Sequence, residues 1–252
     1  MGLSVAEKRA AFRALHEDGC FVLPNPWDLG SLRRLERMGF KAVASTSSGY
    51  AWSMGREDGD MSRDEVLAHL TMLCGATDLP LNADFEAGFA EDAAGVAANV
   101  ALAVATGVAG LSIEDRVGKE LYEIPLAVER MRAAREAAGA DVVLVGRYEG
   151  FLIGQTDVSA AIRRLVAYAE AGADCLYAPG IKDIGAIREV VAAVRPKPVN
   201  VLLMGPEMRV EELAAAGVRR VSVGGGLAAL AWKGFDHAAK LLRDEGWIPP
   251  RN

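Results

Sequence analysis

Residues 170–180 read EAGADCLYAPG, and this short stretch decides the fold. An Ala-rich helical segment ends at Gly172 and is followed at once by a run of β-type residues. A glycine at this point takes the left-handed conformation that closes the last turn of a helix. The same order recurs at residues 36–45 (ERMGFKAVAS), 105–115 (ATGVAGLSIED) and 215–225 (AAGVRRVSVGG). One helix–glycine–strand unit is used repeatedly, which predicts helices that alternate with parallel strands.

Eight β-type runs can be counted along the chain, and helical segments separate most of them. The β-type runs are residues 20–24, 41–45, 79–84, 110–114, 141–147, 173–178, 198–203 and 219–223. The helical segments are 30–38, 63–74, 93–106, 126–138, 158–171, 184–194 and 210–216, with a long last helix over 227–245. The 252 residues match the roughly 250 of a typical (β/α)₈ barrel. We therefore predict an α/β fold, a TIM-type (β/α)₈ barrel in a single domain over residues 1–252, with an open doubly wound sheet as the alternative.

The composition excludes several classes of function. Of the residues, 51% are hydrophobic and 25% are charged, with a formal net charge of −6 and no long basic run. This leaves no electrostatic footprint for nucleic acid. No stretch reaches the roughly 18 continuous apolar residues of a membrane span, and the first residues lack the apolar centre of a signal peptide. We expect a cytoplasmic protein with neither nucleic acid nor membrane as a partner.

Carboxylates follow the predicted strands, where a parallel barrel carries its working side chains. Asp84 and Glu86 lie two residues apart at the end of one strand and so share a face. Glu114 ends the next strand, and Asp58 lies in the loop after the second. Like charges brought together raise one another's pKa unless a cation compensates them, and Mg²⁺ binds one or two carboxylates while keeping several waters. These acids predict a Mg²⁺ site, the alternative being that they are helix caps and solvated loop residues.

Positive charge and small polar residues lie at other strand ends. Arg147 ends the fifth strand, where its guanidinium could bind a carboxylate or phosphoryl group in a bidentate fork or pair structurally with Glu149. Asn200 lies in the seventh strand. Residues 224–226 are three glycines that suit either a phosphate cradle or a tight turn. Accessible backbone N–H groups for an anion are expected where the second strand ends, at Thr46, Ser47, Ser48 and Gly49. His16, His69 and His237 fall in helices away from the strand ends and are expected on the surface or in the core.

With these residues in view, the chain resembles the isocitrate lyase and phosphoenolpyruvate mutase superfamily. The segments that carry the resemblance are NPWD (25–28), STSSGYAWSMGREDGD (45–60), LNADFEAGF (81–89), LSIED (111–115), VGRYEGF (145–151), AGADCLYAPG (171–180), KPVNVL (197–202) and RRVSVGG (219–225). The resemblance implies an α/β barrel whose C-terminal helix is exchanged between the subunits of a homodimer or homotetramer. It also implies Mg²⁺ or Mn²⁺ and a 2-oxo acid or its enolate.

At the matched positions, the resemblance implies a role for each residue. Asp84 is similar to the direct metal ligand of the family, and Asp58, Glu86 and Glu114 to the acids that hold metal-bound waters. Arg147 is similar to the anion-binding arginine. The segment from Thr46 to Gly49 is similar to the carboxylate-binding turn.

The loop after Glu114 departs from two branches of the family. Isocitrate and methylisocitrate lyases carry a catalytic Cys there, and phosphonomutases carry a Lys- and Asn-containing loop. Residues 114–122 read EDRVGKELY, a short segment with neither Cys nor Asn. The chain is therefore more similar to the branch related to oxaloacetate decarboxylases and other carbon–carbon lyases.

These observations predict an enzyme, a Mg²⁺-dependent carbon–carbon lyase or decarboxylase. Its substrate is expected to be a small 2-oxo- or 2-hydroxycarboxylate such as oxaloacetate, cleaved through a metal-stabilised enolate. The alternatives are a phosphonomutase or phosphonopyruvate hydrolase acting on a P–C bond, and a weakly catalytic protein that binds 2-oxo acids. The candidate catalytic residues are Arg147, Asp58 and Glu114. The candidate substrate-binding residues are Thr46, Ser47, Ser48, Gly49, Arg147 and Asn200.

Overall fold

The strands form one parallel sheet that curls into a nearly closed barrel. A computed structural model describes residues 2–250, and the hydrogen-bonded order of its strands is β1-β10-β9-β8-β7-β4-β3-β2. The strands are β1 (Phe21–Leu23), β2 (Val43–Ala44), β3 (Leu81–Asp84), β4 (Gly110–Glu114), β7 (Val143–Arg147), β8 (Cys175–Tyr177), β9 (Val199–Leu202) and β10 (Arg220–Ser222). Where β1 and β2 meet, the Ala44 N–H donates to the Pro24 carbonyl at 3.0 Å. The TIM-type barrel is confirmed and the open sheet is not formed, whereas a single domain over residues 1–252 stays a prediction.

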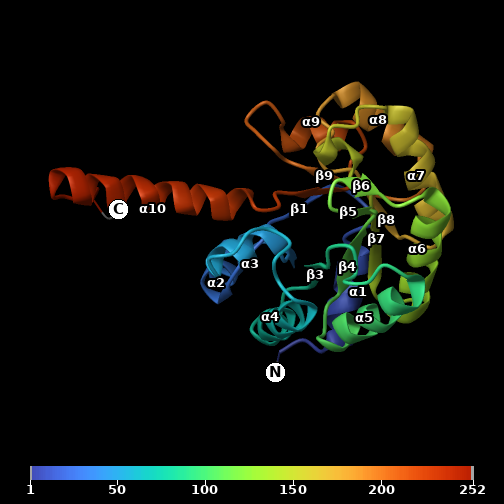
Figure 1. The fold of residues 1–252 in the computed structure, drawn as a ribbon, viewed down its shortest axis with the longest axis horizontal. Coiled ribbons are helices and arrows are strands. Elements are labelled where there is room, and N and C mark those ends of the chain that lie inside the picture. Colours follow the sequence, from blue (N-terminus) through green and yellow to red (C-terminus); the bar gives the residue numbers. More distant parts are fainter. Residues whose placement is uncertain (1, 251–252) are drawn as a thin grey trace.

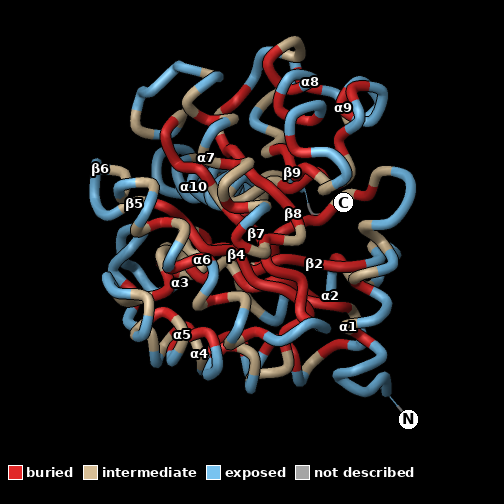
Figure 2. Tube along the Cα trace, turned by 90° about the vertical axis from the view of Figure 1, so that its right-hand side faces the viewer, coloured by how far each residue is buried: buried red, intermediate tan, exposed pale blue. Residues whose placement is uncertain are grey.

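Helices cover the outside of the barrel (Figure 1), and the strands form its buried centre (Figure 2). They are α2 (Leu29–Arg37), α4 (Arg63–Gly75), α5 (Ala93–Ala105), α6 (Ile124–Ala138), α7 (Val158–Glu170), α8 (Ile184–Ala193) and α9 (Val210–Ala215). Side-chain caps begin five of these helices, each accepting a backbone N–H of the first turn. The caps are Asp28, Ser62, Asp92, Asp157 and Asp183. Because caps and closing glycines are local signals, the predicted helix bounds agree with these to within two residues.

An N-terminal helix, α1 (Val5–Ala14), closes the floor of the barrel. Its bounds were not predicted, and His16, which was expected within a helix, lies just after it. Phe12 of α1 is fully buried and clusters with Val143 and Cys175, which begin their strands. Its ring meets Phe21 and His16 edge-on, with centroids 6.3 and 4.8 Å away. The chain thus seals the N-terminal ends of the strands, so small molecules reach the interior from the C-terminal ends.

Three short elements at the open end also differ from the predicted pattern. Residues 46–49, expected as a turn, instead form the cap and first turn of α3 (Ser47–Ser53), with the Thr46 hydroxyl accepting the Gly49 N–H. A two-stranded hairpin, β5 (Arg116–Val117) and β6 (Glu120–Leu121), follows β4. A 3₁₀ turn, η1 (Gly150–Ile153), follows β7. None of these segments has the length or periodicity that makes an element visible in sequence.

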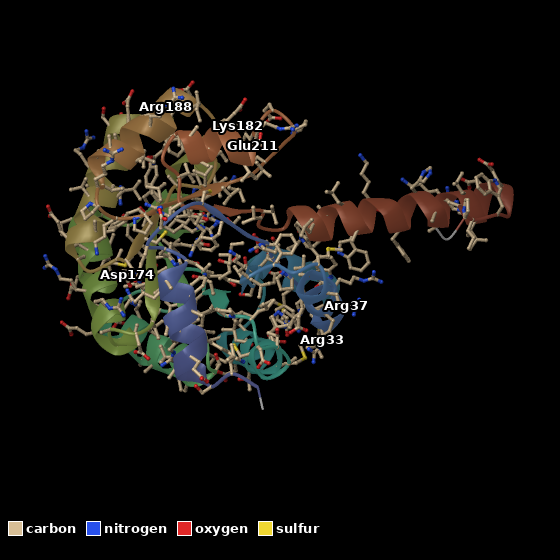
Figure 3. All side chains as sticks on the ribbon, turned by 180° about the vertical axis from the view of Figure 1, so that it is seen from behind. Arg33, Arg37, Asp174, Lys182, Arg188 and Glu211 are labelled. Atoms are coloured by element: carbon tan, nitrogen blue, oxygen red, sulfur yellow. The ribbon has the colours of Figure 1, made fainter. Side chains whose placement is uncertain are left out.

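The last helix, α10 (Gly226–Glu245), extends away from the barrel (Figure 1). Along most of its length its side chains meet no other element, as Figure 3 shows from behind. Leu230, Phe235 and Leu242 are 65%, 63% and 55% exposed. No helix within residues 2–250 has the length and apolar character to cross a membrane. An apolar surface of this kind on a projecting helix is unusual for an isolated chain.

His16 lies in the turn after α1, against the inside of the barrel floor. Its Nδ1 lies 2.8 Å from the Phe12 carbonyl and its Nε2 lies 3.4 Å from Nη1 of Arg220. Burial, followed by the charge of Arg220, lowers the pKa of His16 from 6.5 to about 3. Below pH ~6.5 the His16 imidazole therefore binds a proton in the unfolded chain but stays neutral in the folded chain, so the free energy of unfolding falls as the pH falls. This contribution to stability is complete above that pH and is lost progressively as the pH falls toward 3.

We expect His16→Gln to weaken the acid sensitivity of the fold, because glutamine can keep both polar contacts without titrating. Between pH 6 and pH 4 the free energy of unfolding should fall less steeply than in the wild type, by at most about 1.4 kcal/mol per pH unit. Urea titrations across this range provide the measurement, with His237→Gln on the exposed part of α10 as the matched control. Equal pH slopes in His16→Gln and the wild type would contradict a buried neutral His16.

Candidate active site

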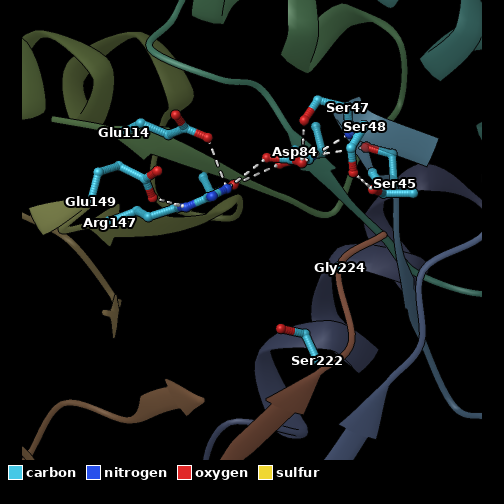
Figure 4. Close-up of polar contacts among 12 residues, drawn as sticks. Ser45, Ser47, Ser48, Asp84, Glu114, Arg147, Glu149, Ser222 and Gly224 are labelled. Carbon is cyan, nitrogen blue, oxygen red and sulfur yellow. Dashed lines mark hydrogen bonds and ion pairs between the residues drawn. The ribbon is translucent and has the colours of Figure 1, made fainter. Parts of the chain in front are cut away.

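Arg147, at the C-terminal end of β7, lies at the centre of a cluster of acids (Figure 4). Its Nη1 lies 3.1 Å from Asp84 Oδ1 and 2.9 Å from Glu114 Oε1, and its Nε donates to Glu149. Burial disfavours the charge, but Glu114, Glu149 and Asp84 outweigh it and raise the pKa of Arg147 well above its usual value. The structure therefore brings Asp84, Glu114 and Arg147 together, and it forms the structural pair with Glu149 as well.

A second layer of contacts fixes the position of Glu149, which is fully buried. Its carboxylate accepts from Nε of Arg116, in the β5–β6 hairpin, at 2.9 Å. Its backbone N–H donates to Asp115 Oδ1 at 2.9 Å, and the other oxygen of Asp115 accepts from the Tyr168 hydroxyl at 2.5 Å. The acids around Arg147 are thus held from behind by the chain itself, which limits how far they can relax when a ligand binds.

The start of α3 holds Asp84 from the opposite side. Asp84 Oδ2 accepts from the backbone N–H of Ser47 at 3.0 Å and from its hydroxyl at 3.1 Å, and the Asp84 N–H donates to Ser45 Oγ at 2.8 Å. Close packing explains why residue 49, in the first turn of α3, is a glycine. A Cβ on Gly49 would lie 2.7 Å from Thr46 Cγ2 and 3.0 Å from Trp27 Cβ. The polar segment predicted from sequence therefore meets the predicted acid directly.

Two further acids, Asp58 and Glu86, crowd the same region beside Glu114. Burial raises the pKa of Asp58 above its usual value, and burial together with the charge of Asp84 raises that of Glu86 to about 7. Burial also raises the pKa of Glu114, against the attraction of Arg147. These three residues line one cavity of about 360 Å³ with Ser47 and Arg116. Oε1 of Glu86 is buried and has no hydrogen-bond partner.

The chemistry of this donor set fits a hydrated divalent cation. Among residues 2–250 no three His, Cys, Asp or Glu side chains form a ready-made metal-binding group. Mg²⁺ does not require one, because it binds one or two carboxylates and keeps several waters. The unpartnered Glu86 oxygen and the raised pKa of Asp58 and Glu86 mark excess negative charge that a cation would offset. The residues that would hold Mg²⁺ or Mn²⁺ remain those predicted: Asp84, with Asp58, Glu86 and Glu114 around it.

A smaller cavity, of about 180 Å³, opens beside Asp84 and reaches into the barrel. This volume is below the roughly 300 Å³ at which sites for drug-sized ligands begin, so it suits a small acid. Five of the residues predicted to bind substrate line it, whereas Gly49 is buried behind them. The five are Thr46, Ser47, Ser48, Arg147 and Asn200. The Gly224 N–H, a candidate phosphate donor, is already bound to Asn25 Oδ1 at 2.9 Å.

Four residues of this region were missed in the sequence: Arg116, Asp115, Tyr177 and Arg220. Arg116 lies in a hairpin too short to predict. Asp115 follows Glu114 directly, and nothing local shows that it turns away from the cavity to support Glu149. Tyr177 and Arg220 both line the cavity. Alternation along the predicted strands is the signal that could place both side chains inside the barrel, below the strand ends.

The model of the phosphoenolpyruvate phosphomutase family matches residues 12–243. The chain belongs to this family. The 2-methylisocitrate lyase of Escherichia coli (strain K12) is 31% identical over 226 residues, 84% of this chain and 76% of the relative. The oxaloacetate decarboxylase of Pseudomonas aeruginosa (strain UCBPP-PA14) is 29% identical over 228 residues, 85% of this chain and 78% of the relative.

Among solved structures, a candidate lyase/mutase from Burkholderia cenocepacia J2315 superposes with a TM-score of 0.94 at 45% identity. The superposition covers 97% of this chain and 91% of the chain from Burkholderia cenocepacia. The resemblance to the isocitrate lyase and phosphoenolpyruvate mutase superfamily is thus confirmed, and so is the prediction of an enzyme. The relatives support carbon–carbon lyase chemistry.

We expect Arg147→Lys to lower kcat/KM for 2-oxo acids at least about tenfold while the fold is retained. A lysine ammonium keeps the charge, but it cannot serve the Nη1 and Nε partners at once. Steady-state kinetics and circular dichroism check the two expectations. Arg163→Lys, on the exposed face of α7, is the matched control. Unchanged kcat and KM in Arg147→Lys would remove this residue from the site.

Proposed function

We propose that the protein is a divalent-cation-dependent carbon–carbon lyase, most simply a decarboxylase, that acts on a small 2-oxo- or 2-hydroxycarboxylate. The observation that carries the proposal is the position of Asp84, held between Ser47 and Arg147 where the small cavity meets the crowded acids. The names of two relatives, a 2-methylisocitrate lyase and an oxaloacetate decarboxylase, agree with this class of substrate. The proposal includes a cytoplasmic location, in line with the composition.

The wall of the cavity offers donors to a carboxylate. The hydroxyls of Thr46 and Ser48 lie 3.1 Å apart and both residues line the cavity. One of the two hydroxyls donates to the other, and the remaining proton can turn toward a bound oxygen. When bound, the divalent cation supplies a Lewis acid for the oxygen of the 2-oxo group. Arg147 keeps Asp84 and Glu114 in place while charge develops on the substrate.

Tyr177 is suited to donate to the oxyanion that bond cleavage leaves behind. It lines the cavity and is 7% exposed. Burial raises the pKa of Tyr177 to about 12, so its hydroxyl keeps the proton at neutral pH. The Arg147 guanidinium carbon lies over one face of the Tyr177 ring, 5.3 Å from its centroid, and this contact helps to fix the orientation of the ring. The ion pair between Arg116 and Glu149 holds the β5–β6 hairpin beside the acids. In this position the hairpin shields the acids from bulk water.

Pyruvate release from oxaloacetate tests the proposal. With Mg²⁺ we expect release well above the enzyme-free rate at the same Mg²⁺ concentration, and its loss on chelation. Asp84→Ala should lower the enzymatic rate at least about 100-fold, because it removes the proposed direct ligand. Asp64→Ala, at an exposed acid of α4, should match the wild type. Wild-type turnover by Asp84→Ala would contradict the cation assignment.

A P–C bond reaction is the second candidate, because the matching family model describes a phosphomutase. The same cavity and Arg147 would serve a phosphonate of similar size. Phosphonopyruvate offered under the same conditions separates the two. Turnover of phosphonopyruvate alone would replace the lyase proposal, and tight binding of 2-oxo acids without any turnover would identify a binding protein instead.

We further propose a homodimer or homotetramer in which α10 packs on a neighbouring subunit. Only Ala228 is buried among the residues of α10, while Leu230 and Phe235 are exposed. We expect the wild type to be oligomeric by light scattering and Phe235→Glu to shift it toward the monomer, since a charge would enter an apolar contact. Lys233→Glu, on the opposite face of α10, is the control. A monomeric wild type would contradict this assembly.

A further inference from the structure

Arg220 of β10 occupies the interior of the barrel, a place that apolar layers ordinarily fill. The residue is 2% exposed. Its Nε donates to Asn200 Oδ1 at 3.0 Å, and its Nη1 lies 3.3 Å from Asn82 Oδ1 and 3.4 Å from His16 Nε2. The two asparagines are uncharged, and His16 is neutral because its pKa is lowered to about 3. All the polar partners of this guanidinium are therefore neutral.

No carboxylate balances this charge. Within residues 2–250 Arg220 forms no ion pair, and Asp174, on the floor side, is already paired with Arg13 and Arg135. The contrast with Arg147 is sharp, since that guanidinium contacts three carboxylates. Burial of a charge without a counter-ion is costly. A chain that keeps Arg220 inside the barrel carries a positive charge that an incoming anion can neutralise.

The charge is also within reach of a ligand. Arg220 lines the same cavity of about 180 Å³ as Asp84 and Arg147. Within the described part of the chain its hydrogen bonds leave from Nε and Nη1, so the Nη2 donors are uncommitted. Asn200 Nδ2 donates to Ser222 Oγ at 3.0 Å, and the Ser222 hydroxyl also contacts that of Tyr177, so Ser222 lies among the polar groups beside Arg220. One end of the cavity thus holds acids and Arg147, and the other holds unpaired positive charge.

We propose that Arg220, with Ser222 beside it, is the subsite for the second carboxylate of a short dicarboxylate substrate. This inference rests on the proposed function, because it assumes that the first carboxylate lies at the Asp84 end. The cavity of about 180 Å³ is too small for a drug-sized ligand and limits the substrate to a short acid. A monocarboxylate leaves Arg220 buried and unpaired, and a site with unpaired buried groups discriminates against such a ligand.

A matched pair of ligands tests the subsite, since L-malate is L-lactate with a second carboxylate. Both are titrated calorimetrically into the wild-type enzyme with Mg²⁺. We expect malate to bind about 10- to 100-fold more tightly, the range for hydrogen bonds to a charged group. In Arg220→Gln this advantage should disappear while the affinity for lactate changes less than about threefold. Arg219→Gln, the next residue on the chain, pairs with Asp18 outside the barrel and should behave as the wild type.

A second variant guards against misfolding of Arg220→Gln. Asn200→Asp puts a carboxylate at the position that now accepts from Arg220 Nε at 3.0 Å. It neutralises Arg220 without removing it, so the fold should be kept and the advantage of malate over lactate should be lost.

The outcomes separate the subsite from the proposed function. Equal affinity of the wild type for both ligands, or a full malate advantage in folded Arg220→Gln or Asn200→Asp, overturns the subsite and leaves the lyase proposal standing. Failure of the wild type to bind either ligand overturns the subsite, and the lyase proposal falls with it only if oxaloacetate releases no pyruvate.

Discussion

The guanidinium of Arg147 ties together the carboxylates of three strand ends. Asp84, Glu114 and Glu149 come from the ends of β3, β4 and β7, and all three lie against this one side chain. Without it their mutual repulsion and burial would drive them apart or protonate them. Its charge does not offset the whole set, because Asp58 and Glu86 add further negative charge nearby. The site is thus fixed in shape and still short of positive charge, which is the condition that favours a bound cation.

The barrel supplies two different interiors to this site. Near the floor, Phe12, Val143 and Cys175 form an apolar plug beneath the cavity. Above it many of the side chains that line the cavity are polar, and Arg220 contributes a charge that only neutral groups contact. Because the floor is sealed, a ligand enters past α3 and the hairpin and meets Asp84 before Arg220. The order of charges along this path, acidic first and basic beyond, suits a cation-bound dianion.

Local signals allowed much of this architecture to be predicted. Caps such as Asp28 and Asp183, and closing glycines such as Gly172, fix helix ends through contacts a few residues away. The strand-end acids and Arg147 were predicted because position on a parallel strand dictates which end of the barrel a side chain reaches. Arg220 and Arg116 were not, since their roles depend on distant partners. Arg220 meets His16 across 204 positions and Asn82 across 138. The bounds of α1 were not predicted, although its capping box of Ser4 and Glu7 is a local signal of the same kind as the other caps.

Anomalous diffraction from a crystal soaked in Mn²⁺ tests the central claim most directly, because it locates the cation without relying on activity. The charge arrangement around Arg147 predicts one strong peak beside Asp84, on the side that faces Glu86, Glu114 and Asp58. A peak at another place on the molecule, or none at millimolar Mn²⁺, would contradict it.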